Sequence, residues 1–160
     1  MLIIFAFFNG LGRMITMARR DWVDDHIRRY QETDGVDGHI WAGRDGAQSL
    51  PCLLLTTTGH QSGEETTTAL IYGTRGSDCI VVASTGGAPD NPTWYRNLVA
   101  NPGVSVQVLG DKYTANARTA TEEERQSLWA TMADIFPTYN DYHETAKATR
   151  EIPVVVLERV

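Results

Sequence analysis

Residues 66–84 read TTTALIYGTRGSDCIVVAS. Two apolar, β-branched runs, 66–72 and 79–84, flank a short turn that contains Gly73 and Gly76. Such runs are typical of β-strands, and a glycine-rich link of this length is typical of a hairpin. Because a parallel pair needs a crossover connection of about a dozen residues or more, we predict that these two strands are antiparallel.

The same kind of pattern continues in both directions along the chain. Further strands are predicted at residues 51–58, at 104–108, after the turn Gly110-Asp111, and at 152–157. Helices are predicted at residues 21–32, at 93–100, from the capping box of Thr121 and Glu124 to Pro137, and from Thr138 onward. Residues 33–49 are interpreted as an exposed connection. These elements predict an α+β fold in which a small antiparallel β-barrel is flanked by helices.

The composition is that of one globular domain. The chain has 160 residues, of which 42% are hydrophobic and 21% charged, and this length suffices to bury a core. Lys and Arg number 14 against 20 Asp and Glu, which gives a net charge of −6. Because proteins bind nucleic acid mainly by neutralising phosphates with basic residues, we expect no nucleic-acid partner.

The cysteines and histidines carry no metal-site or disulfide pattern. Cys52 and Cys79 both lie in apolar, strand-like runs and form no Cys-x-x-Cys motif. We interpret them as buried thiols in a reducing compartment, which predicts a cytoplasmic protein. The four histidines show no metal-ligand spacing, so no metal site is predicted.

Residues 1–20 form an N-terminal segment distinct from the predicted domain, 21–160. Leu2 to Phe8 is wholly apolar, and Arg13, Arg19 and Arg20 follow it. The apolar run is too short to span a bilayer and lacks the positive leader of a signal peptide. An interfacial helix at the inner face of the cell membrane and a helix packed on its own domain both stay open.

Three segments contain polar groups that a hydrophobic core does not explain. They are Thr56–Gly63, Val82–Leu98 and Phe136–His143. The first is a strand end whose turn offers amides and hydroxyls to an anion, the second a Gly-Gly loop before an aromatic helix, and the third a tyrosine pair at helical spacing. Taken singly, each is also explained by ordinary turns and aromatic packing.

Taken together, the three segments resemble a known family. The chain carries Thr-Thr-Thr-Gly-x-x-Ser-Gly at 56–63, Val-Val-Ala-Ser-x-Gly-Gly-Ala-Pro-x-x-Pro-x-Trp-Tyr-x-Asn-Leu-x-Ala-Asn-Pro at 81–102, and Pro-x-Tyr-x-x-Tyr at 137–142. This order is similar to that of the deazaflavin (coenzyme F420)-dependent nitroreductase family. The resemblance implies a split β-barrel like that of FMN-binding proteins. It also implies hydride transfer from F420H2 to an electron-poor small molecule such as a quinone, an enone lactone or a nitroaromatic.

The resemblance also implies roles for individual residues. The coenzyme's phosphate and tail would lie along His60, Gln61, Ser62, Thr66 and Thr67. The deazaflavin ring would be lined by Leu70, Val82, Ala83, Ser84 and Thr85, and closed off by Thr93, Trp94, Tyr95, Arg96 and Asn97. Tyr139 would donate a proton or orient the substrate with Ser84 beside it, and Trp94, Phe136 and Tyr142 would wall the substrate slot.

This chain departs from the family pattern at its cationic positions. Family members usually carry Arg or Lys at the positions of His60, Gln61, Thr66 and Thr85. We therefore expect weaker tail binding, or compensation from Arg75 or Arg96. Two alternatives stay open: an FMN-dependent split-barrel oxidoreductase, and a non-catalytic protein that binds a deazaflavin or a lipid. Either a monomer or a homodimer is compatible with the sequence.

Overall fold

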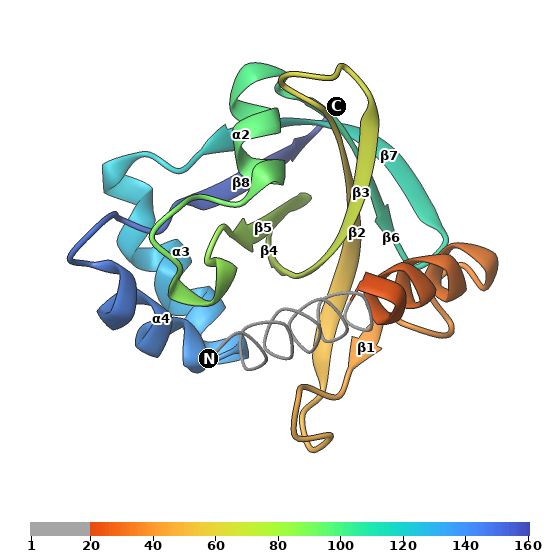
Figure 1. Ribbon diagram of the computed structural model, residues 1–160, viewed down its shortest axis with the longest axis horizontal. Helices are drawn as coiled ribbons and strands as arrows, with labels where there is room; N and C mark the ends of the chain where they lie inside the picture. The colour runs from red at the N-terminus through yellow and green to blue at the C-terminus, as the bar shows by residue number, and fades with distance from the viewer. Residues whose placement is uncertain (1–19) are drawn as a thin grey trace, which may run out of the picture.

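A strongly curved antiparallel sheet with helices around it makes up residues 20–160, the part of the chain that the computed structural model describes (Figure 1). Residues 20–32 are helical, and the remaining elements follow in the order β1 (Ile40–Trp41), β2 (Leu50–Thr58), β3 (Glu65–Ile71), β4 (Gly73–Arg75), β5 (Asp78–Val82), η1 (Thr85–Gly87), α2 (Thr93–Ala100), β6 (Gly103–Val108), β7 (Asp111–Thr119), α3 (Glu122–Ile135), α4 (Thr138–Ala146) and β8 (Val154–Arg159). Because residue 20 is already helical, Asp21 lies inside the first helix and does not begin it. The predicted N-terminal segment and its membrane contact lie almost wholly outside the described residues.

The sheet runs in the order β1-β2-β6-β7-β8-β5-β4, and β3 adds to β2. Every pair is antiparallel. β3 and β4 lie toward opposite ends of this order although only Tyr72 separates them in the chain. The sheet therefore curls into an incomplete barrel, which confirms the predicted α+β split-barrel fold.

The predicted hairpin between residues 66–72 and 79–84 is wrong in its partners. β3 pairs with β2, from Cys52 opposite Ile71 to Thr58 opposite Glu65. β5 pairs with β4, which lies inside the predicted turn, and Arg75 opposes Asp78. A two-residue turn at Gly76-Ser77, with Gly76 at φ 61°, closes this shorter hairpin because its left-handed backbone suits the twist of tightly linked strands.

Both faces of β5 and β8 are buried. One face contributes Ile80, Val82, Val154 and Val156 to a cluster under α3 and α4. The other contributes Cys79, Val81, Val155 and Leu157 to the barrel interior. Because successive strand side chains point to opposite faces, two buried faces explain the uninterrupted apolar runs in the sequence. Cys52 and Cys79 are both free and buried, as predicted.

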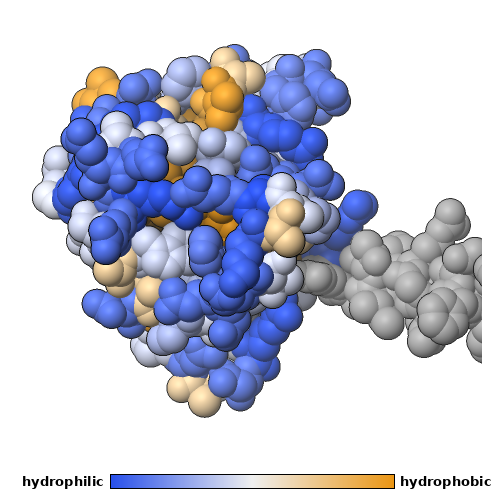
Figure 2. All heavy atoms as spheres, turned by 90° about the vertical axis from the view of Figure 1, so that its left-hand side faces the viewer, coloured by the Kyte–Doolittle hydropathy of each residue, from blue (hydrophilic) through white to orange (hydrophobic). Residues whose placement is uncertain are grey.

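Helices α3 and α4 cover one outer side of the sheet. The capping box is present: the Thr121 hydroxyl accepts from the Glu124 amide, and the Glu124 carboxylate accepts from the Thr121 amide. Phe136 ends α3, and Pro137 precedes α4. The face that includes these helices is mainly hydrophilic at its surface (Figure 2). Within residues 20–160, no helix combines the length and the apolar character that crossing a membrane requires.

Candidate active site

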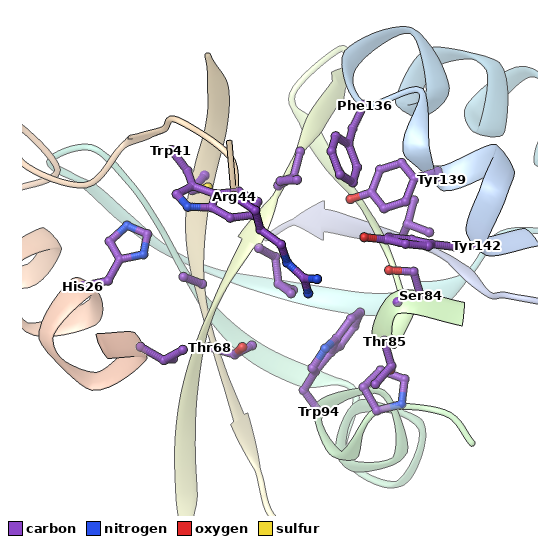
Figure 3. A pocket seen from close by; sticks show the side chains of 18 of the residues that line it. His26, Trp41, Arg44, Thr68, Ser84, Thr85, Trp94, Phe136, Tyr139 and Tyr142 are labelled. Atoms are coloured by element: carbon purple, nitrogen blue, oxygen red, sulfur yellow. The ribbon is translucent and has the colours of Figure 1, made fainter. Parts of the chain in front are cut away.

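A cavity of about 370 Å³ opens between β3, the end of β5, the helix at 20–32, α2 and α4 (Figure 3). Eight of the residues singled out from the sequence line it: Leu70, Val82, Ser84, Thr85, Trp94, Phe136, Tyr139 and Tyr142. The structure adds eleven that the sequence did not single out: Trp22, Val23, His26, Trp41, Arg44, Cys52, Thr68, Ala69, Ile71, Gly86 and Pro92. The four residues assigned to the substrate slot therefore meet in one cavity with half of those assigned to the ring, whereas Ala83 and four residues of α2 lie outside its lining.

Tyr139 and Tyr142 form one wall of this cavity. Tyr139 is only 4% exposed, and its ring packs edge-on against Phe136, with 5.0 Å between ring centroids. Its hydroxyl points into the cavity (Figure 3) and makes no hydrogen bond within residues 20–160. Burial raises the pKa of Tyr139 above its ordinary value, so the phenol stays protonated near neutral pH and remains a hydrogen-bond donor.

The loop that follows β5 brings Ser84 and Thr85 to the cavity. Thr85 adopts φ 45°, an uncommon left-handed conformation for a residue other than glycine, and Gly86 and Gly87 continue at φ 63° and 81°. A Cβ on Gly87 would lie 2.9 Å from the Tyr142 carbonyl oxygen. The glycine at this position therefore lets the loop touch α4, and the contact fixes Ser84 relative to the two tyrosines.

Arg150 holds the same loop from behind. Its guanidinium donates to the carbonyls of Ala83 (3.1 Å), Ser84 (2.8 Å) and Ala88 (2.8 Å), and to Asn91 Oδ1 (2.8 Å). Burial lowers the pKa of Arg150 relative to its ordinary value, but an arginine remains charged in proteins. One side chain thus binds three backbone carbonyls and one side-chain oxygen of the same loop, and this sets the conformation of the cavity rim.

On α2, only Trp94 of the five residues singled out at 93–97 lines the cavity. Tyr95 turns toward the sheet, and its hydroxyl lies 2.8 Å from Thr119 Oγ1. Asn97 is 1% exposed, accepts from the His60 amide (3.0 Å) and donates to Thr57 Oγ1 (3.1 Å). Asn97 therefore ties α2 to the β2–β3 turn, while Thr93 and Arg96 are exposed on the helix.

The β2–β3 turn, which the sequence assigned to the coenzyme's tail, lies outside the cavity. His60, Gln61 and Ser62 are exposed, and the Ser62 hydroxyl accepts from the Glu64 amide (3.1 Å). Glu64 and Glu65 follow directly and are exposed as well. The local charge at this turn is therefore negative, which opposes an anionic tail.

β3 connects the cavity with this turn. Thr68 lines the cavity, and Thr66 shares its face because strand side chains alternate. Thr67 points to the other face, where its hydroxyl lies 2.8 Å from Thr56 Oγ1. Arg75, which was expected to compensate for the missing cations, lies on β4 and forms an ion pair with Glu124 at 2.8 Å.

Comparison with known proteins decides the family of this chain. A sequence model described as F420H(2)-dependent quinone reductase matches residues 22–159. The chain belongs to this family. It is 35% identical over 137 residues to the F420H(2)-dependent quinone reductase Rv1261c of Mycobacterium tuberculosis, and the alignment covers 84% of this chain and 87% of that relative.

Solved structures support the same assignment. A structure described as an F420-H2 dependent reductase (FDR-A) is 37% identical, with a TM-score of 0.62, over 68% of this chain and 94% of that one. Another, described as a domain-swapped dimer, is 34% identical, with a TM-score of 0.64, over 88% of this chain and 99% of that one. The predicted F420-dependent oxidoreductase is thus confirmed, and F420 is the coenzyme of the family.

The cavity suits a planar ring. Leu70 and Val82 give its lining apolar surface, and the Trp94 indole adds an aromatic face. Gly86 has no side chain to cover the backbone beside the cavity, and a Cβ at this position would meet nothing within 4 Å. Such a cavity, apolar with a few convergent polar groups, is typical of ligand sites, and these residues would hold the deazaflavin.

Two groups of cavity residues were missed from the sequence for different reasons. Trp22, Val23 and His26 belong to the helix predicted at residues 21–32, but nothing in the sequence indicated that this helix borders the cavity. Arg44 falls in the stretch interpreted as an exposed connection. Arg150, behind the loop, precedes the last strand without any motif, so no sequence signal pointed to its role.

Proposed function

We propose that the chain transfers a hydride from F420H2 to a quinone, with both ligands bound in the cavity beside Tyr139. The observation that carries this proposal is the placement of the Ser84 and Tyr139 hydroxyls at a largely apolar cavity, where neither makes a hydrogen bond to any of residues 20–160. Membership of the quinone reductase family supports the choice of acceptor.

When bound, reduced F420 supplies a hydride, because the deazaflavin is confined to two-electron chemistry. The protein's contribution is binding, orientation and electrostatics. Leu70 and Val82 exclude water from one side, and the aromatic wall holds the acceptor as a flat ring. The Tyr139 hydroxyl donates a hydrogen bond to the acceptor oxygen on which negative charge develops, which lowers the barrier.

Ser84 supports this role from the loop side. Its carbonyl is held by Arg150, whereas its hydroxyl takes part in no side-chain hydrogen bond within residues 20–160. The fixed backbone therefore presents a hydroxyl that can bind either an oxygen or a ring nitrogen of a ligand. We assign Ser84 to orienting the ligands and Tyr139 to the charge-stabilising contact.

The function is tested by following F420H2 absorbance with purified protein and 1,4-naphthoquinone, an enone lactone or a nitroaromatic. We expect the protein to oxidise F420H2 only when the quinone is present. The rate of this oxidation should reach a maximum as the coenzyme site of the protein fills. Coenzyme binding without oxidation by any of the three acceptors would favour the non-catalytic carrier over the reductase.

Gln61→Lys tests the proposed tail path along β3. Because Gln61 is exposed beside Glu64 and Glu65, a lysine there adds a positive charge where the family usually has one. We expect the variant to bind F420 about threefold or more tighter than the native protein at low salt. This gain in affinity should shrink as added salt screens the exposed charges. Lys in place of Gln126, exposed on α3, is the matched control. An unchanged F420 affinity in a folded Gln61→Lys protein would contradict this path.

A further inference from the structure

The cavity has an uneven charge. Although the whole chain has a net charge of −6, no Asp or Glu is among the described residues that line the cavity. Arg44 carries the only formal charge in that part of the lining, with His26 taken as neutral. An acidic protein thus contains a cavity whose described wall is positive.

Arg44 has no carboxylate partner within residues 20–160, unlike most arginines of the fold. Arg28, Arg29, Arg75, Arg118, Arg125 and Arg159 all form ion pairs. The nearest acid in sequence, Asp45, is engaged elsewhere, because its Oδ1 accepts from the Ala47 amide (3.1 Å) and Gln48 Nε2 (3.4 Å). The Arg44 guanidinium therefore keeps its donors for a ligand.

The loop between β1 and β2 gives Arg44 a defined position. Gly43 precedes it at φ 75°, and the Gln48 amide donates to the Ala42 carbonyl at 2.8 Å, which closes the loop. From this loop the Arg44 side chain extends over the cavity toward the side where Ser84 and Tyr142 lie (Figure 3). The loop therefore lies across the cavity from the tyrosines, and the guanidinium points toward them.

Next to Arg44, two indoles form an apolar wall. Trp22 and Trp41 both line the cavity, with 6.3 Å between their ring centroids. His26 packs against Trp22 at 5.8 Å, and its Nε2 lies 2.8 Å from the Gly38 carbonyl oxygen. An apolar wall beside a free guanidinium suits a flat or aliphatic body that ends in an anionic group.

We propose that Arg44 binds a carboxylate on the hydride acceptor, and that this contact selects acceptors with an acidic side chain over neutral ones. This proposal rests on the proposed function, since it describes the acceptor of the same site. The coenzyme also has anionic groups, but its expected tail path leaves the cavity along Thr68 and Thr66, on β3. Arg44 lies on the separate loop before β2.

The test compares a 1,4-naphthoquinone carrying a propionate side chain with the methyl ester of the same compound. The two carbons of the propionate separate its charge from the ring, so the pair differs little in reduction potential. We expect the native protein to show kcat/KM for the acid about fivefold or more above that for the ester, the size expected of one partly exposed charge-assisted contact. In Arg44→Met this ratio should fall to about one, whereas the rate with the ester should stay within about twofold.

A binding measurement and a control variant separate an effect of Arg44 on the acceptor from an effect on the coenzyme. Binding of the acid and the ester, followed by tryptophan fluorescence, gives the same comparison without turnover. Lys112→Met removes one positive charge on β7, outside the cavity lining, and should leave the acid-to-ester ratio unchanged. If Arg44→Met weakens F420 binding and keeps the acid-to-ester ratio, the anion belongs to the coenzyme and the proposal is wrong. If neither quinone is reduced but Arg44 still governs tighter binding of the acid, the proposed function fails and the anion site stands.

Discussion

Tyr139→Phe should lower turnover with a quinone by about tenfold or more, because it removes the hydroxyl to which we assign the charge-stabilising contact with the acceptor. Stability should change by less than about 0.5 kcal/mol, since the ring keeps its contacts and the lost hydroxyl makes no hydrogen bond within residues 20–160. Affinity for F420 should stay within a few-fold. Steady-state rates and coenzyme titration on the same protein measure all three.

Tyr113→Phe is a suitable control for this substitution. It also removes one tyrosine hydroxyl, which lies 3.2 Å from Cys79 Sγ and outside the cavity lining. The turnover rate of the Tyr113→Phe protein should therefore match that of the native protein. If Tyr139→Phe retains full activity, Tyr139 is only a wall of the cavity. The charge-stabilising contact would then have to come from Tyr142 or Ser84.

Arg150→Met should have the second large effect, on both stability and coenzyme binding. The substitution leaves three backbone carbonyls and Asn91 Oδ1 without their common donor. Because water can bind some of these oxygens once the guanidinium is gone, we expect the free energy of unfolding to fall by only about 2–4 kcal/mol. Because Ser84 and Thr85 lose their fixed backbone, F420 affinity should fall about tenfold or more.

Arg125→Met separates a general loss of stability from a loss of loop geometry. Arg125 also donates to a backbone carbonyl, that of Ile152 at 2.6 Å, and pairs with Glu151, but it does not touch the cavity loop. We expect Arg125→Met to destabilise the protein with little change in F420 affinity. Equal F420 affinities of the Arg150→Met and native proteins, measured well below their melting temperatures, would show that Arg150 does not position the loop.

Local patterns in the sequence predicted much of the fold. The capping box of Thr121 and Glu124, the proline after Phe136 and the turn at Gly110-Asp111 each act within a few residues, so their consequences are visible in the chain itself. Strand partners were harder to predict, because the chain offers two hairpin links close together. The glycine-containing link 59–64 joins β2 to β3, and the two-residue turn at Gly76-Ser77 joins β4 to β5, so the two strands of the predicted hairpin take other neighbours.

In the candidate site, residues that belong to local motifs could be predicted from the sequence, whereas residues that act through distant contacts could not. Ser84, Trp94 and Tyr139 belong to motifs whose spacing marks them, and they do meet in the cavity. Asn97 belongs to the same motif, but its amide is used to hold the β2–β3 turn, a role that depends on His60 far away in the chain. Arg44 and Arg150 act through long-range contacts and carry no local signature, so only the structure reveals them.

The central claim, that the cavity holds F420, is tested most directly by titrating the purified protein with F420 and FMN side by side. Trp22, Trp41 and Trp94 line the cavity, so a bound ring should quench tryptophan fluorescence. We predict saturable quenching by F420 and an affinity for FMN at least about tenfold weaker, a difference of about 1.4 kcal/mol. Micromolar affinity for FMN without any quenching by F420 would contradict the account.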